Sequence, residues 1–185
     1  MKAELPRMHR VYLSLGSNIN PAANLRACLD LLRARTRLIA VSPVYETAPV
    51  GFTEQANFLN TAVLVETDLT PEAFRAAVIV PIEQALGRVR DPANKNAPRT
   101  IDLDISLWDD AVFDFGEKPW HVPDRDIVRF SHVARPLADL APDYVHPEDG
   151  RTLAQIAASL PAEGLILKWR PGNDGWGIPG EASGR

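Results

Sequence analysis

The chain has 185 residues, 45% of them hydrophobic, with a net charge of −4 and a single cysteine. This length predicts one globular domain, and the slightly acidic balance argues against a nucleic-acid or anionic-membrane partner. One cysteine excludes an internal disulfide and a cysteine-rich zinc site, and the chain has neither an apolar run of ~20 residues to span a bilayer nor a secretory signal, so we expect a cytoplasmic protein.

Strands and helices alternate along the first part of the chain. A strand is predicted at 11–15, and Asn20-Pro21 then begins a helix with an apolar stripe at every third or fourth position. Further strands are predicted at 38–45, 58–65 and 101–108. A second helix is expected from Thr70-Pro71 to Gly87, and Pro81 inside it removes a backbone hydrogen bond, which predicts a kink or a bulge.

The order strand, helix, strand, strand, helix, strand is that of a ferredoxin-like fold. We therefore expect an α+β protein in which both helices cover one face of an antiparallel sheet. Helical patterns at 135–140 and 153–160 predict a C-terminal helical extension. The expected organisation is an N-terminal extension over 1–9, one domain over 10–165 and a tail over 166–185, whose glycine-rich end from Gly172 is expected to be flexible.

Two aspartates lie two residues apart on the last predicted strand. Asp102 and Asp104 share one face with Thr100 and Ser106, because side chains alternate across a strand. Neighbouring carboxylates repel each other, and a magnesium ion that also binds phosphates would offset the repulsion. An isolated pair of this kind is more often part of a solvated polar face, so the pair alone does not establish a magnesium site.

A basic run precedes the acidic pair. It comprises Arg88, Arg90, Lys95 and Arg99, and arginine side chains suit phosphate oxygens. Acids that hold metal beside arginines that hold phosphate are typical of phosphoryl transfer. The charge pattern equally allows internal ion pairs between these arginines and the aspartates. The phosphate-binding loop of the P-loop enzymes is absent.

Four segments resemble the 6-hydroxymethyl-7,8-dihydropterin pyrophosphokinase family, in the family's order. The most specific is Pro98-Arg99-Thr100-Ile101-Asp102-Leu103-Asp104-Ile105, and the resemblance covers about residues 10 to 160. The others are Leu15-Gly16-Ser17-Asn18, the run from Ser42 to Gly51, and Phe58-Leu59-Asn60-Thr61-Ala62, with Gly87-Arg88-Val89-Arg90 shortly before the acidic segment.

The resemblance implies a ferredoxin-like enzyme of folate biosynthesis that moves pyrophosphate from ATP to the hydroxymethyl group of the pterin and releases AMP. It implies two Mg²⁺ ions on Asp102 and Asp104, with ATP as co-substrate and the pterin alcohol as substrate, in a monomer or weak oligomer. On the nucleotide side it implies Arg88 and Arg99 on the phosphates as catalytic residues, with further contacts from Arg90, Glu83 and the backbone of Ile105.

On the pterin side, the resemblance implies backbone contacts from Gly16, Thr47 and Val50. Asn60 corresponds to the amide that reads the pterin edge, and Phe58 to an aromatic ring that stacks on the pterin. His132 falls where the family has a second stacking aromatic residue.

The chain also departs from the family pattern. Asp124 stands where relatives have a phosphate-side histidine, and Asn96 stands where the best-known members have an aromatic residue. We expect Arg125 or Arg129 to take over the phosphate contact, with Asp124 turned away or paired with one of them. The alternative function is a catalytically weakened relative that binds pterin or nucleotide. A metal-dependent nucleic-acid enzyme is a third reading, which the net charge disfavours.

Overall fold

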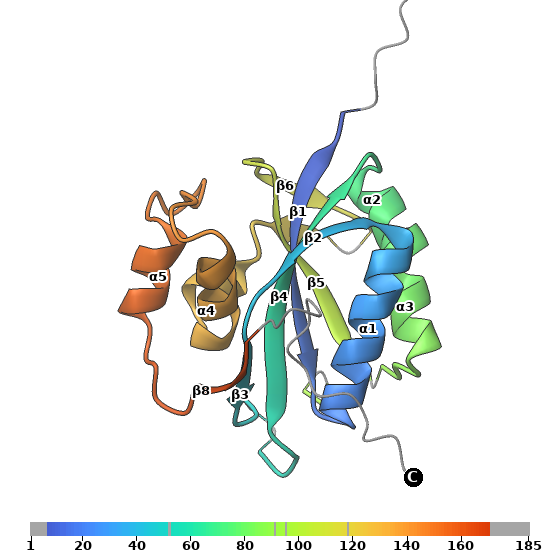
Figure 1. The fold of residues 1–185 in the computed structure, drawn as a ribbon, viewed down its shortest axis with the longest axis vertical. Coiled ribbons are helices and arrows are strands. Elements are labelled where there is room, and N and C mark those ends of the chain that lie inside the picture. Colours follow the sequence, from blue (N-terminus) through green and yellow to red (C-terminus); the bar gives the residue numbers. More distant parts are fainter. Residues whose placement is uncertain (1–6, 52, 91, 95, 118, 171–185) are drawn as a thin grey trace, which may run out of the picture.

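The computed structural model describes residues 7–51, 53–90, 92–94, 96–117 and 119–170. An antiparallel sheet forms its centre, in the order β5-β1-β4-β3-β8 (Figure 1). Its strands are β1 (His9–Ser17), β3 (Val44–Thr47), β4 (Phe58–Thr67), β5 (Asp102–Trp108) and β8 (Ile166–Trp169). A further strand, β2 (Arg37–Val41), pairs with β4 beyond the stretch that pairs with β3.

The expected ferredoxin-like order is confirmed, with one refinement. The strand predicted at 38–45 is divided into β2 and β3, because Pro43 has no N–H to donate. Ser42 maintains the contact with β4 at this break: its N–H donates to the Ala62 carbonyl at 2.9 Å, and its hydroxyl accepts from the Ala62 N–H at 2.9 Å.

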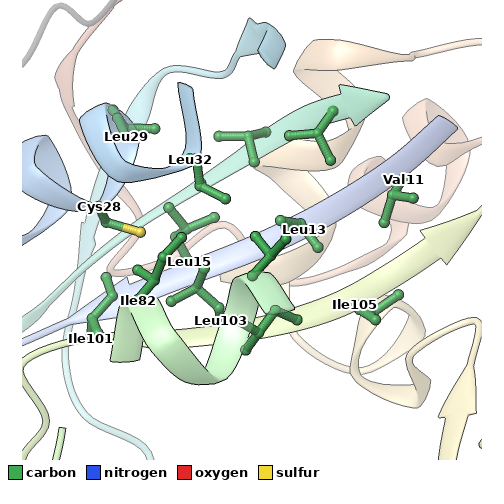
Figure 2. Close-up of a cluster of buried hydrophobic side chains, with 14 of the residues drawn as sticks. Val11, Leu13, Leu15, Cys28, Leu29, Leu32, Ile82, Ile101, Leu103 and Ile105 are labelled. Atoms are coloured by element: carbon green, nitrogen blue, oxygen red, sulfur yellow. The ribbon is translucent and has the colours of Figure 1, made fainter. Parts of the chain in front are cut away.

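One face of the sheet packs against α1 (Pro21–Arg35) and the helical segment over 71–85 (Figure 1). The stripe predicted for the first helix is fully buried there and comprises Leu25, Cys28, Leu29 and Leu32. It meets alternate residues of β1 and β5, with Ile82 of the second helical segment beside them (Figure 2). This face is the main hydrophobic core, and both predicted helices cover it as expected.

The C-terminal helices cover the opposite face. These are α4 (Ser131–Leu140) and α5 (Leu153–Ser159), which pack on the other alternate residues of the sheet, Tyr12, Ala62, Leu64 and Leu107. The predicted helical extension is therefore confirmed, and it encloses a second core. Because α4 and α5 cover only part of this face, the ends of β1, β4 and β5 near Gly16, Asn60 and Asp102 line a cavity instead.

The second helical segment contains the bulge that Pro81 predicts. It consists of α2 (Pro71–Phe74), a π-helical turn η1 (Arg75–Ile79) and α3 (Val80–Ala85). Thr70 caps its start, since the Thr70 hydroxyl accepts from the Ala73 N–H at 3.3 Å. Gly87, at φ 69°, follows its end as expected.

The end of the domain differs from the prediction. Residues 166–169 form β8, which pairs with β3, so the tail expected from residue 166 is wrong for these four positions. Residues 171–185, which include the glycine-rich end, lie outside the described residues. The hairpin of β6 (Phe113–Phe115) and β7 (Trp120–Val122) was also not predicted. None of the described helices has the length and apolar character needed to cross a lipid bilayer.

Candidate active site

Two cavities meet beside the acidic pair. The first has a volume of about 240 Å³ and the second about 290 Å³. Both are lined by Asp104, Asp124 and Asp126, so these carboxylates stand between the two spaces. Two adjoining cavities with charged groups at the junction suit a reaction between two bound substrates.

The floor of the first cavity is a row of residues across three strands. Gly16 on β1 pairs with Asn60 on β4 at one side and with Asp102 on β5 at the other. Two residues along β1, on the same face, Ser14 pairs with Asp104. A Cβ atom at position 16 would lie 3.4 Å from the Asn60 side-chain oxygen, so glycine keeps the space above Asn60 open.

All the residues expected on the pterin side line this first cavity: Gly16, Thr47, Val50, Phe58, Asn60 and His132. The Asn60 amide donates to the Thr47 hydroxyl at 2.9 Å, which orients the amide within the cavity. Phe130 also lines the cavity, and its ring stacks with that of His132 at a centroid distance of 5.4 Å. Phe130 was missed in the sequence, since only the fold places its ring in the lining of the cavity.

Arginines surround Asp102. Arg99 forms an ion pair with the Asp102 carboxylate, and an Arg88 nitrogen lies 3.6 Å from the same carboxylate. The Arg88 side chain is only 7% exposed, and its Nε has no hydrogen-bond partner. Because buried N–H groups are normally satisfied, this orphan donor indicates a place for an acceptor such as a phosphate oxygen.

A neighbouring ion pair joins Arg90 to Glu83. Their charged atoms lie 2.8 Å apart, and Glu83 is buried behind β5, where it also accepts from the Leu103 N–H at 3.4 Å. Neither side chain, nor that of Arg88, lines either cavity; Arg99 does line the first. The ion pairs that the charge pattern left open are therefore present alongside the candidate phosphate contacts.

The carboxylates at the junction crowd one another. Asp104 is exposed to the two cavities, yet desolvation by the protein around it raises its pKa above the ordinary value, and the charges of Asp102, Asp124 and Glu83 raise it further. Desolvation likewise raises the pKa of Asp124, to which the charges of Asp126 and Asp102 add. A bound cation would relieve this repulsion. The residues thus fit a magnesium ion that carboxylate and phosphate oxygens share.

The described residues contain no group of three or more acidic, histidine or cysteine side chains placed to hold a metal ion. Two carboxylates would leave most positions around a magnesium ion to water and to the phosphates of a ligand, which is the usual pattern for this ion. The geometry therefore suits an ion that arrives with a nucleotide better than a permanent structural ion.

The second cavity combines an apolar floor with aromatic and cationic walls. Ile105, expected on the adenine side, lies in its lining, and so does Arg125. The Arg75 guanidinium lies over the Trp120 ring, 4.2 Å from its centroid. His121 bridges two acids, Asp114 at 2.8 Å and Glu148 at 2.9 Å. Sequence reasoning missed Arg75, Trp120 and His121, because they belong to the π-helical turn and to the unpredicted hairpin.

The arrangement expected around Asp124 is wrong. Asp124 is not turned away, since it lines both cavities. Its carboxylate accepts from the Asp126 N–H at 3.0 Å and so caps the short helix η2 (Arg125–Val128). Arg129 pairs with Asp126 at 3.4 Å and lines neither cavity. Of the two candidate arginines, only Arg125 lines a cavity, the second one.

Asn96, a departure from the family pattern in the sequence, lies in the lining of the first cavity. The side chain of Gln55 connects the two loops at this entrance. It accepts from the Asn18 amide at 2.8 Å and donates to the Asn96 carbonyl at 2.8 Å. Amide hydrogen bonds therefore join the loops around 55 and 96.

Comparison with known proteins identifies the family. The family described as 7,8-dihydro-6-hydroxymethylpterin-pyrophosphokinase (HPPK) matches residues 12–142. The chain is 40% identical over 162 residues to the 2-amino-4-hydroxy-6-hydroxymethyldihydropteridine pyrophosphokinase of Pseudomonas aeruginosa, covering 85% of this chain and 96% of that protein. It is 38% identical over 161 residues to the protein of the same name from Methylorubrum extorquens, covering 85% and 98%.

Solved structures share the fold. The crystal structure of Plasmodium falciparum HPPK-DHPS A437G with SDX-DHP has a TM-score of 0.68 and 15% sequence identity to this chain. The match covers 84% of this chain and 46% of that one, so this chain spans less than half of the solved protein. Together with the family match and the two bacterial relatives, these findings show that the chain belongs to the 7,8-dihydro-6-hydroxymethylpterin-pyrophosphokinase family.

Proposed function

We propose that the protein transfers pyrophosphate from ATP to the hydroxymethyl group of 6-hydroxymethyl-7,8-dihydropterin and releases AMP, a step of folate synthesis. The observation that carries this proposal is the pair of cavities that share Asp104, one lined by the expected pterin residues and the other by Ile105. Membership of the family, and the names of the bacterial relatives, support the same reaction.

In this proposal the pterin occupies the first cavity. The Asn60 amide, oriented by Thr47, hydrogen-bonds the polar edge of the pterin, and Phe58 and His132 contact its ring. The hydroxymethyl group then lies toward the carboxylates, at the end of the cavity that adjoins the second space. Holding both substrates in this geometry supplies a large part of the rate, because a reaction between two molecules becomes a reaction within one complex.

ATP occupies the second cavity, with its phosphates at the junction. Arg99 and Arg88 exchange part of their pairing with Asp102 for phosphate oxygens. Arg88, whose side chain lines neither cavity, turns toward the junction to do so, and its orphan Nε gains an acceptor. Asp102 and Asp104 would hold magnesium, for which we propose two ions. Bound there, magnesium would neutralise phosphate charge and align the phosphates for in-line attack. The hydroxymethyl oxygen attacks the β-phosphorus, and AMP leaves.

The test is the formation of AMP from ATP, measured with and without the pterin alcohol and with and without magnesium. We expect AMP release that requires both additions, together with equimolar pyrophosphorylated pterin. A protein that binds pterin and ATP but releases no AMP would instead be the catalytically weakened relative. Release of phosphate and ADP would show a different reaction.

A further inference from the structure

One wall of the second cavity is a stack of two side chains from distant parts of the chain. Arg75 comes from the π-helical turn η1, and Trp120 comes from strand β7 of the hairpin. The guanidinium lies 4.2 Å from the centroid of the indole ring. Phe115, on the neighbouring strand, has its ring centroid 5.5 Å from that of Trp120. The two rings are tilted by 34° to each other, and with the guanidinium they form a continuous aromatic and cationic wall.

The rest of the cavity has an apolar part and an acidic part. Ile79, Leu103, Ile105 and Phe115 give it an apolar lining, and the carboxylates that it shares with the first cavity are Asp104, Asp124 and Asp126. Phosphates held beside the acidic pair leave the apolar and aromatic part for the base of the nucleotide. A neutral heteroaromatic ring gains most from stacking on a flat aromatic or guanidinium surface.

Two features indicate that the stack is more than a link between the helix and the hairpin. Trp120 remains 40% exposed although it lines a cavity and contacts both Arg75 and Phe115. Among the described residues, moreover, no carboxylate lies within ion-pair distance of Arg75. A guanidinium that rests on a partly exposed indole has surface left to cover, and a planar ligand of the size of a nucleobase would cover it.

We propose that the Arg75–Trp120 stack binds the base of ATP and determines the preference of this enzyme for purine over pyrimidine nucleotides. The inference rests on the proposed function, and it assigns nucleotide selectivity to two residues outside the segments that carry the family resemblance. A purine offers a larger surface to the stack than a pyrimidine, so loss of the stack should penalise ATP more than CTP.

The experiment measures the KM for ATP, the KM for the pterin and the ratio of kcat/KM for ATP over CTP in Trp120→Ala, Trp120→Phe and Arg75→Ala. Stacking of one base on an aromatic ring is worth about 1–3 kcal/mol, so Trp120→Ala should raise the KM for ATP roughly five- to hundred-fold. The KM for the pterin should stay constant, and the preference for ATP over CTP should fall. Trp120→Phe should retain most of the preference, and Arg75→Ala should lose part of it.

Arg37→Ala serves as the control, because Arg37 is an exposed arginine that pairs with Glu66 and lies on β2, which β4 and β1 separate from β5. An unchanged KM for ATP in folded Trp120→Ala and Arg75→Ala would overturn the inference, as would an equal rise in KM for both substrates. If Trp120→Ala does not fold, Arg75→Ala and Trp120→Phe still test the inference, since both variants keep an aromatic ring at position 120.

Direct ATP binding, measured by calorimetry on the same variants, separates this inference from the proposed function. A wild-type protein that binds ATP through Trp120 but forms no AMP would keep the inference and lose the function. If the wild-type protein forms AMP and the variants bind ATP normally, the proposed function stands and the inference is wrong. Absence of both ATP binding and AMP formation in the wild-type protein would overturn both.

Discussion

The two cavities are built in different ways. The residues of the first lie on adjacent strands of the central sheet, where Asn60, Gly16 and Asp102 form one row that the backbone ladders hold in register. The second is enclosed by a hairpin of two three-residue strands and by a helix interrupted by a π-helical turn. Backbone hydrogen bonds thus fix the positions of the first set, whereas side-chain contacts such as Arg75–Trp120 position much of the second.

This difference bears on how each substrate is recognised. A sheet row cannot shift without breaking several backbone hydrogen bonds, which suits the reading of a rigid bicyclic ring by a single amide. Side-chain contacts hold the hairpin, and single substitutions can remove them. Among them are the ion pairs of His121 with Asp114 and Glu148. We therefore expect substitutions in the first cavity to act on chemistry and pterin selectivity, and those in the second to act on nucleotide affinity and local stability.

The largest effect should come from the junction itself. Asp102→Asn and Asp104→Asn preserve side-chain size but remove the charge that we propose for magnesium. We expect AMP formation to fall by at least about a thousand-fold, or roughly 4 kcal/mol of barrier. Far-ultraviolet circular dichroism should show an intact fold. Asp68→Asn is the matched control, because Asp68 is exposed and lines neither cavity. Near-normal turnover in Asp102→Asn would contradict the mechanism.

A smaller and more selective loss is expected on the pterin side. Asn60→Ala leaves the Thr47 hydroxyl and the pterin edge without their partner, at a cost of about 1–3 kcal/mol. The KM for the pterin should rise roughly five- to hundred-fold while that for ATP changes little. Asn57→Ala is the control, since Asn57 lies three residues away on the same segment but outside both cavities. An equal rise for both substrates would place Asn60 outside the pterin site.

The sequence predicted the first cavity much better than the second, for physical reasons. Alternation along a strand is a local property, so the shared face of Asp102 and Asp104 follows from spacing alone. The missing N–H of Pro81 is equally local, and the bulge is confirmed beside it. The β6–β7 hairpin has strands of only three residues, which is too short for any alternation to be recognised.

Long-range packing decides the remaining differences. Trp120 meets Arg75 across 45 positions of the chain, and no local pattern encodes such a contact. Strand β8 was mistaken for a tail although Ile166, Leu167 and Trp169 are apolar, because a strand of four residues is too short for its alternation to be recognised. Asp124 illustrates the same limit: its sequence position suggested an ion pair with a neighbouring arginine, whereas its carboxylate caps the helix that follows.

Two arginines that the sequence treated as equivalent should now behave differently. Arg125 lines the second cavity, whereas Arg129 pairs with Asp126 and lines neither cavity. We expect Arg125→Ala to weaken ATP binding about ten-fold, the lower end for a charge-assisted hydrogen bond, because the side chain is exposed. Arg129→Ala should change the affinity by less than about two-fold. Calorimetric titration with ATP compares them, and a loss confined to Arg129→Ala would reverse this assignment.

The smallest expected effect concerns the anchoring of the hairpin by His121. Hydrogen bonds to Glu148 and then to Asp114 raise the pKa of His121 above its ordinary value. A raised pKa in the folded state means that the stabilisation is complete below about pH 6.5, the unfolded value, and is lost as the pH rises through the folded value. We expect less than about 1 kcal/mol, since the pairs are close to solvent and screened.

The wild-type protein alone cannot reveal this contribution, because burial lowers the pKa values of His132 and His146, so these residues change stability with pH in the opposite sense. The measurement is therefore a double difference. The free energy of urea unfolding is determined at pH 6 and at pH 8.5 for the wild-type protein and for His121→Gln. The wild-type protein should lose more stability, or gain less, between these values than the variant does. Identical pH dependence in the two proteins would show that the His121 ion pairs do not stabilise the hairpin in solution.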